Sequence, residues 1–440
     1  MKHLILCLLL CGCLQAAAQA PYTITLKKAA NQPAPALQSY CIATMGNFWL
    51  LIGGRTNGFH GTAGSGSTFP SSASNTSIWV VDMNSNKSWK GDIPASLQYQ
   101  LSSTNMAYYQ DGNTLYIIGG YGAGCANDGC YQTFSQVTAV DVQRVIAAVQ
   151  NGYGSNNYIK TMNDPRMAVT GGYLVKLNDW FHLVMGQNYT GKYSGGVSGK
   201  YTEQIARFKI DNSGSAPAVT NYSVITTNEQ YNGANQFHRR DYPSVKMVMP
   251  ANRNVGVAVF GGVFNNQGGP FINPVYFEDM GFNTLAQIDT NFKQRFCMYD
   301  CAAVSAYNSA TGEAYVSFIG GITDWYIDDS GNEVPGNASN FMPWFNRVST
   351  IVRSTKGTQE YPQKNVTLPG YIGANAAFIL NPAISLIDKS GEVIDYGKLQ
   401  TGNNLIGWMY GGIEATAPQS NGFNPTSASS TIYEVWLQKN

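Results

Sequence analysis

The sequence contains few charged residues. Only 12% of its 440 residues are Asp, Glu, Lys or Arg, compared with ~25% in an average soluble protein. The formal net charge is +1, so no global field favours nucleic acid or an anionic membrane surface. We therefore expect no nucleic acid among the partners of this protein.

Long apolar runs and the common catalytic motifs are also missing. Beyond its first residues, no stretch approaches the ~18 consecutive apolar residues of a membrane span. The Gly-x-Ser-x-Gly, His-Glu-x-x-His and phosphate-loop patterns do not occur, and no histidine accompanies a cysteine pair at a zinc-like spacing. The sequence therefore predicts no transmembrane span, no metal site and no cofactor.

The first residues have the pattern of an export signal. Lys2 and His3 give a short positive start, residues 4–10 are apolar, and residues 16–18 are small alanines. We expect a signal peptide over residues 1–18, which makes the protein periplasmic, outer-membrane-associated or extracellular.

A second interpretation of the same segment remains open. Leu10-Cys11-Gly12-Cys13 resembles a bacterial lipobox, in which Cys13 carries a lipid anchor. Cys11 is an unusual residue at its position in such a motif, and plain secretion is the interpretation we favour.

Five cysteines follow the signal segment, and export makes disulfides permissible. Cys125 and Cys130 flank a short loop that contains glycine, so we predict a disulfide between them. Cys297 and Cys301 are four residues apart and their pairing stays undecided. Cys41 lies in an apolar run and is expected to be a buried thiol.

Glycine and tyrosine are abundant, at 47 and 27 residues, and the apolar residues recur as a repeat. An apolar run of five or six residues ends in a glycine pair or its equivalent, as such runs do when they form buried strands. The six copies lie at residues 48–54, 114–120, 180–187, 256–262, 314–321 and 406–412. In the third copy Gln187 replaces the second glycine. Units of this kind cannot bury their own faces, so they have to pack against one another.

The repeat resembles the kelch motif. In the first copy Gly53-Gly54 is followed by Ile78-Trp-Val-Val-Asp82 and then by Trp89. Further third strands are expected at residues 137–142, 204–211, 275–278, 347–353 and 431–437. The resemblance implies an all-β fold, a six-bladed kelch-like β-propeller over residues 19–440 as a single domain.

The two ends of the chain suggest how the ring closes. The last copy stops after its third strand, near Leu437. The strand Tyr22–Lys27 can supply the missing outer strand, so we expect the N-terminal strand to close the last blade. Closure within one blade removes an open edge between the first and last units.

The binding face of a propeller is formed by loops on one rim, so the candidate site residues come from those loops. His238-Arg239-Arg240-Asp241-Tyr242 is the densest polar cluster. We interpret it either as a pocket for carboxylates and sugar rings or as ion pairs that join neighbouring blades. The remaining candidates are Arg55, His60, Arg166, Arg295, Tyr299, Asp324, Trp325 and Tyr326.

Several polar residues also have simpler structural interpretations. His60 follows a glycine pair on a Gly-rich loop and is expected to be exposed. His182 lies within a strand and is expected to be structural. Trp325-Tyr326 forms either a sugar platform or an ordinary packed loop. The acidic run from Asp324 to Glu333 lacks calcium-loop spacing, so we expect a solvated turn.

The sequence favours a binding module for a glycan or a protein ligand over an enzyme. The first alternative is a mutarotase or epimerase for an acidic sugar such as sialic acid, because some bacterial kelch propellers are sialic acid mutarotases. The second is a structural adhesion protein. Copper chemistry of the galactose-oxidase type needs two histidines and two tyrosines on the metal, which His60, His182 and His238 are not expected to provide.

Overall fold

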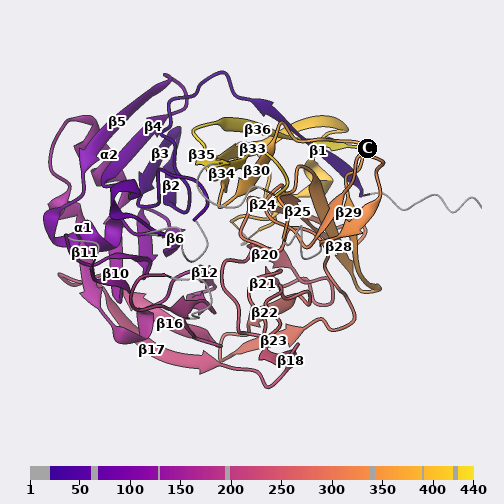
Figure 1. Cartoon of the computed structure of the whole chain (residues 1–440), viewed down its shortest axis with the longest axis horizontal. Coiled ribbons are helices and arrows are strands. Elements are labelled where there is room, and N and C mark those ends of the chain that lie inside the picture. The colour runs from indigo at the N-terminus through magenta and orange to yellow at the C-terminus, as the bar shows by residue number, and fades with distance from the viewer. Residues whose placement is uncertain are drawn as a thin grey trace, which may run out of the picture.

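A computed structural model of the chain describes residues 20–60, 68–126, 129–193, 199–336, 342–388, 391–419 and 425–440. The expected signal peptide and the lipid-anchor candidate Cys13 lie outside the described residues. The described part is all-β and propeller-like, and Figure 1 shows its larger sheets following one another in chain order around a common centre.

The four main strands of each larger sheet are antiparallel to their neighbours, as the repeated apolar runs predict. Five sheets of the described part have four strands and a sixth has five. The first contains β2 (Cys41–Met45), β3 (Phe48–Ile52), β4 (Ser77–Asp82) and β5 (Lys87–Asp92). The second contains β6 (Ala107–Asp111), β7 (Thr114–Ile118), β10 (Gln136–Asp141) and β11 (Ile159–Asn163). The third contains β12 (Tyr173–Leu177), β13 (Trp180–Val184), β16 (Ile205–Asp211) and β17 (Ala218–Ile225).

The other three sheets follow the same order. The fourth contains β20 (Ser244–Val248), β21 (Val255–Val259), β22 (Val275–Asp279) and β23 (Thr284–Ile288). The fifth contains β24 (Ala303–Asn308), β25 (Glu313–Ile319), β28 (Val348–Ser354) and β29 (Gly357–Pro362), with β32 (Ile394–Asp395) added in parallel to β24. The sixth contains β31 (Ala377–Leu380), β33 (Gly402–Tyr410), β36 (Ile432–Lys439) and β1 (Tyr22–Lys28).

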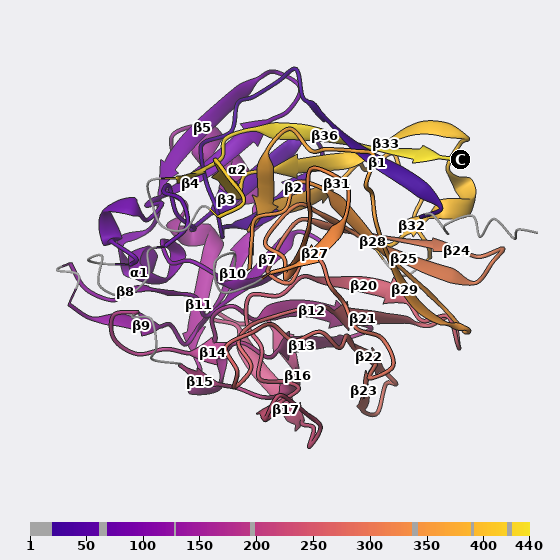
Figure 2. The same ribbon diagram turned by 45° about the vertical axis from the view of Figure 1, so that its right-hand side comes forward.

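The sixth sheet joins the two ends of the described chain. Strand β1 pairs with β36 in antiparallel register from Tyr22↔Lys439 to Lys28↔Tyr433, and Figure 2 shows the two strands side by side. This pairing agrees with the closure expected from the sequence.

The hydrophobic core lies between neighbouring sheets, not within one central mass. Separate clusters of buried residues join sheets one and two, two and three, three and four, four and five, and five and six. A further cluster, with Trp49, Leu51 and Val81 against Ile379 and Tyr410, joins the sixth sheet back to the first. The packing is therefore cyclic.

The glycine pairs allow neighbouring sheets to approach closely. The backbone φ angles of Gly53 and Gly54 are +72° and +83°, in the left-handed region that favours glycine. In the third copy Met185 (φ +45°) and Gly186 (φ +86°) hold these two positions, so the repeat is shifted by one residue from the alignment that the sequence suggested. Gln187 follows the pair and does not replace its second glycine.

One element was not expected from the sequence. The strand predicted over residues 137–142 ends at Asp141, and helix α2 (Val142–Gln150) begins there. The Asp141 side chain accepts a hydrogen bond from the Arg144 N–H and so caps the helix. The apolar face of α2 packs into the cluster between the first two sheets.

Candidate functional site

The innermost strands of the six larger sheets are β2, β6, β12, β20, β24 and β31. The segments that precede them meet in a ring of backbone hydrogen bonds, here called the axial ring. Its members are Ser39, Asn105, Gly171, Asp241, Asp300 and Asn375. The N–H of each donates to the C=O of the preceding member, at 3.3 Å for Asn105 to Ser39 and 2.8 Å for Asp241 to Gly171. The ring closes where the Ser39 N–H donates to the Asn375 C=O, at 3.5 Å.

The residue types of the axial ring, apart from Ser39 and Asp300, follow from its backbone. Five members, all except Asp300, have φ between +50° and +64°, a region that Gly, Asn and Asp enter more readily than other residues. At Gly171 a Cβ atom would lie 2.6 Å from Asp241 Oδ1. Glycine there leaves room for the hydrogen bond from Asn105 Nδ2 to Asp241 Oδ1, at 2.9 Å.

A small cavity of about 50 Å³, here called the rim pocket, lies on one side of the axial ring. Segments leading into the innermost strands of all six larger sheets contribute to its lining. The lining residues used below are Arg55, Phe59, His60, Phe69, Tyr193, Arg240, Asp241 and Tyr299. Five of them, Arg55, His60, Arg240, Asp241 and Tyr299, were site candidates from the sequence.

Charged and phenolic groups of the rim pocket are held by one another. The Arg240 guanidinium pairs with Asp241 Oδ2 and donates to the hydroxyls of Tyr201 (3.0 Å) and Tyr193 (3.1 Å). Burial and the Asp241 charge raise the pKa of Tyr299 well above its usual value, so this phenol stays protonated. Arg55 lies over the Phe69 ring at 5.1 Å and donates to Asn57 Oδ1 and the Pro70 C=O.

His60 lies among aromatic rings, not in solvent as the sequence suggested. Its ring stacks on Phe59 at 4.5 Å between centroids and lies 5.1 Å from both Phe69 and Tyr193. The pocket therefore combines aromatic faces with two arginines and one carboxylate. Such groups bind sugar rings and anionic substituents.

On the other side of the axial ring lies a larger cavity of about 720 Å³, here called the axial cavity, lined by the innermost strands. Lys246 lines it and pairs with Glu392 at 3.2 Å and with the Tyr109 hydroxyl at 2.7 Å. Asp300 also lines it. Burial first, and then the Asp241 charge, raises the pKa of Asp300 to about 7.

Two residues of the predicted polar cluster belong to the framework. Arg239 is 0% exposed, and its guanidinium donates to the backbone carbonyls of Gln236, Gly261 and Asn273. Tyr242 is buried between the third and fourth sheets, and its hydroxyl donates to the Val184 C=O. Neither side chain lines the rim pocket, because the chain at these positions turns them into the inter-sheet core.

His238 and Arg166 also lie outside the rim pocket. The His238 ring stacks on Tyr201 at 3.7 Å, and its Nδ1 lies 2.5 Å from Glu203 Oε1. Arg166 pairs with Asp164 at 2.5 Å and lies over the Tyr222 ring at 4.3 Å.

The remaining candidates form a separate group. Arg295 pairs with Glu333 and lies 5.5 Å from the Trp325 ring centroid. Trp325 and Tyr326 belong to the hairpin of β26 (Trp325–Ile327) and β27 (Glu333–Pro335). Burial raises the pKa of Asp324 beside them. None of the four lines the rim pocket.

The disulfide prediction is confirmed, since Cys125 and Cys130 are bonded with their Cα atoms 5.8 Å apart. This bridge lies beside the hairpin of β8 (Tyr121–Ala123) and β9 (Tyr131–Thr133), which pairs through Gln132 with Thr190. Cys41, Cys297 and Cys301 are free buried thiols.

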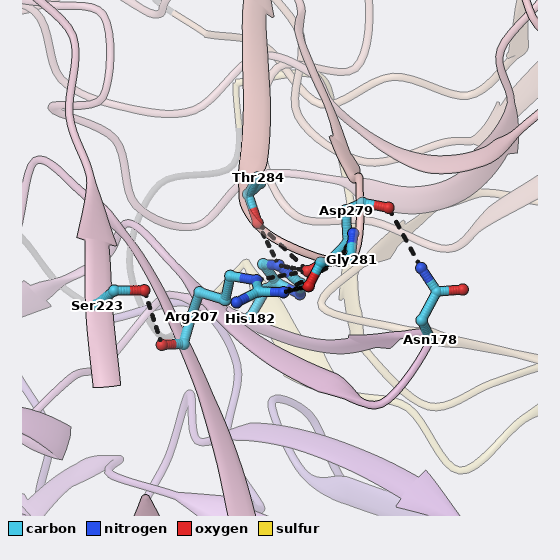
Figure 3. A network of polar contacts seen from close by, with 7 residues as sticks. All are labelled: Asn178, His182, Arg207, Ser223, Asp279, Gly281 and Thr284. Atoms are coloured by element: carbon cyan, nitrogen blue, oxygen red, sulfur yellow. Dashed lines mark hydrogen bonds and ion pairs between the residues drawn. The ribbon is translucent and has the colours of Figure 1, made fainter. Parts of the chain in front are cut away.

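His182 is structural, as the sequence suggested. Its Nε2 lies 2.8 Å from Thr284 Oγ1 and 3.3 Å from Asp279 Oδ2, and Arg207 donates to the same carboxylate at 2.6 Å (Figure 3). The network links the third and fourth sheets.

Metal-binding clusters and membrane helices were searched in the described residues. No group of three or more His, Cys, Asp or Glu side chains that could hold a metal ion occurs there. No helix in the same part of the chain is long and apolar enough to cross a membrane.

Sequence reasoning missed most members of the axial ring and the aromatic wall of the rim pocket. Phe69 and Tyr193 come from loops without a repeat signal. The sequence does contain a signal for the ring members. A small polar residue or glycine stands two or three positions before the first strand of every repeat.

Comparison with known proteins gives likenesses to solved structures and none to the families or curated sequences searched. No protein-family model and no curated protein sequence matches the chain. Among solved structures, that of YjhT is similar with a TM-score of 0.48 and 11% identity, covering 91% of this chain and 99% of that chain.

Proposed function

We propose that this chain is an exported, six-bladed kelch-like β-propeller that acts as a binding module for an acidic glycan. Six larger sheets, a core cluster between each consecutive pair and the closed axial ring support the blade number. A single domain over residues 19–440, released from a signal peptide, fits this arrangement.

The observation that carries the proposal is the composition of the rim pocket. The segments that precede the innermost strands of all six larger sheets contribute to its wall. The wall combines two arginines with a group of aromatic rings. Loops on a rigid scaffold are the usual carriers of binding function. Guanidinium groups pair with carboxylates, and aromatic faces pack on the apolar faces of sugars.

Isothermal titration calorimetry with N-acetylneuraminic acid and glucuronic acid tests this function. We expect saturable binding that weakens at least tenfold, or about 1.4 kcal/mol, in Arg55→Ala and His60→Ala proteins. Arg166→Ala is the matched control, because Arg166 pairs with Asp164 outside the pocket, and its affinity should equal that of the unchanged protein.

Two results would overturn the proposal. One is the absence of binding heat from every acidic sugar. The other is unchanged affinity in both pocket variants. Retention of a protein by the immobilised domain, with no sugar binding, would instead support a protein ligand.

A mutarotase for an acidic sugar is the second candidate, and one feature favours it. Asp241 and Tyr299 both line the rim pocket, so a carboxylate and a phenol are available there for proton transfer. NMR measurement of anomer exchange tests this. Equal exchange rates with and without protein would exclude it.

Export itself is open to a direct test. Mass spectrometry of the mature N-terminus is expected to show a chain that starts near Gln19. A chain that starts at a lipid-modified Cys13 would instead establish the anchored form.

A further inference from the structure

Some side chains of the axial ring have hydrogen-bond partners for their polar atoms, and others do not. Asn105 Oδ1 accepts from the Thr104 hydroxyl at 2.8 Å, and both oxygens of Asp241 accept hydrogen bonds, one from Asn105 and one from Arg240. Asn375 Nδ2 donates to Ser39 Oγ. These contacts satisfy one side of the ring.

The opposite side carries a side-chain oxygen without a donor and a carboxylate without a counter-charge. Asn375 is 9% exposed, and its Oδ1 atom is buried with no hydrogen-bond partner. Asp300 is its neighbour in the ring, since the Asn375 N–H donates to the Asp300 C=O at 2.9 Å. Within the described residues, no lysine, arginine or histidine forms an ion pair with the Asp300 carboxylate.

Both residues line the axial cavity, and a second unpaired oxygen belongs to another residue of its lining. Ser305 is on strand β24, which begins three residues after Asp300, and its Oγ is buried without a partner although the residue is only 4% exposed. Buried polar atoms nearly always have partners, and an unpaired acceptor or carboxylate is costly. Asn375 Oδ1 and Ser305 Oγ therefore lack the partner that buried polar atoms require.

We propose that a hard metal cation, Ca²⁺ or an ion of similar chemistry, binds in the axial cavity between the Asp300 carboxylate and Asn375 Oδ1. Both side-chain ligand atoms of this site are oxygens, which are the ligand type of hard cations. The ring carbonyls keep a second lone pair beyond the hydrogen bonds that they accept, and water fills the remaining positions.

The charge at the site sets the strength of binding. Arg240 neutralises Asp241, so Asp300 alone supplies net negative charge. Ca²⁺ sites of extracellular modules have dissociation constants of about 10⁻⁴–10⁻³ M, and binding in this range is expected here. Asn375 also lines the rim pocket, so cation binding is measured in protein without sugar.

Thermal unfolding of chelator-treated protein at pH 8 tests the site. CaCl₂, MgCl₂, NaCl and KCl are titrated separately at constant ionic strength. We expect one of these cations to raise the Tm saturably, with one ion bound per chain by equilibrium dialysis and elemental analysis. Asp300→Asn should weaken that binding at least tenfold.

A second variant gives a result of opposite sign. Asn375→Asp adds a carboxylate at a backbone position that Asp tolerates, so it should bind the cation at least tenfold more tightly while lowering the Tm of cation-free protein. Asp328→Asn is the matched control. Asp328 lies in the acidic loop outside the ring, where it accepts from Ser330 and Asn332, and its removal should leave binding unchanged.

The proposal is overturned if no cation raises the Tm, or if Asn375→Asp binds the cation no more tightly than the unchanged protein. A higher Tm for Asp300→Asn at every cation concentration would also overturn it, because Asp300 would then hold a proton and not a metal.

Discussion

Individual charged residues in this charge-poor chain connect one sheet to the next. Asp279 at the end of β22 binds Arg207 from β16 and His182 from β13, and it also accepts from the Gly281 N–H at 2.7 Å. Although burial opposes ionisation, these donors hold the pKa of Asp279 far below its usual value. Burial lowers the pKa of His182.

Asp279→Asn is expected to lower the free energy of unfolding by about 3 kcal/mol, because it leaves the buried Arg207 without its counter-charge. Chemical denaturation at pH 7 measures this. The loss should shrink below about pH 4, since the lowered pKa of Asp279 stabilises the fold only while the unfolded carboxylate is ionised.

His182 adds a second, earlier loss of stability in acid. Its folded pKa lies below the unfolded value of 6.5, so the unfolded state takes up the proton first and stability falls as the pH drops below 6.5. The matched control for Asp279 is Asp211→Asn, because this exposed carboxylate on the same strand as Arg207 accepts from the nearby Ser213 N–H and is not part of the network. An equal loss in both variants would contradict a role specific to the network.

At the scale of the strand and its turn, the second residue of each glycine pair joins its sheet to the next. The N–H of Gly120 donates to the Val169 C=O at 2.9 Å, and the N–H of Gly186 donates to Arg239 C=O at 2.8 Å. The first residue of the pair has to pass close to the same segment. Gly119 is the tightest case, because a Cβ there would lie 1.9 Å from the Val169 oxygen.

Gly119→Ala is expected to destabilise the protein by at least about 2 kcal/mol more than Gly112→Ala. Both glycines have positive φ, at +68° and +58°, but a Cβ at Gly112 meets nothing within 4 Å. The control therefore carries only the conformational cost of about 1 kcal/mol. Urea unfolding measures the difference, and equal effects would show that the close approach is unimportant.

Among the elements, the strands that end in glycine pairs were predictable from the sequence and helix α2 was not. The strands that end in glycine pairs have local signals, apolar runs followed by residues that tolerate positive φ, so their positions followed from the sequence. Helix α2 (Val142–Gln150) was missed because it follows the strand with no intervening turn, although Val142, Val145, Ile146 and Val149 have helical spacing.

The candidate site was only partly predictable for a different reason. Arg239 and Arg240 are adjacent and chemically alike, yet one is enclosed in the inter-sheet core and the other lines the rim pocket. Only the direction of the backbone within the turn decides between them. The aromatic wall similarly depends on loops that meet in space but are far apart in sequence, such as those carrying His60 and Tyr193.

For the whole molecule, closure rests on strand β1. All seven of its residues pair with β36, and Tyr22 and Ile24 are buried against the fifth sheet. The Tyr22 hydroxyl also shares a hydrogen bond with Ser317 Oγ at 2.9 Å.

Removal of residues 20–28 is therefore expected to lower the Tm strongly and to promote self-association, because the exposed edge of β36 can pair with other chains. Scanning calorimetry and light scattering against the 20–440 protein measure both effects. A truncated protein that stays monomeric with an unchanged Tm would show that β1 is dispensable for closure.

The antiparallel pairing of β1 with β36 has one more consequence. Since the last link of the ring is made by hydrogen bonds, the peptide chain can be opened elsewhere without removing any sheet contact. A circular permutant that joins the present ends by a short linker and starts anew in the exposed turn between β16 and β17 keeps every strand pair of the present fold. Its order of synthesis changes, and its native contacts do not.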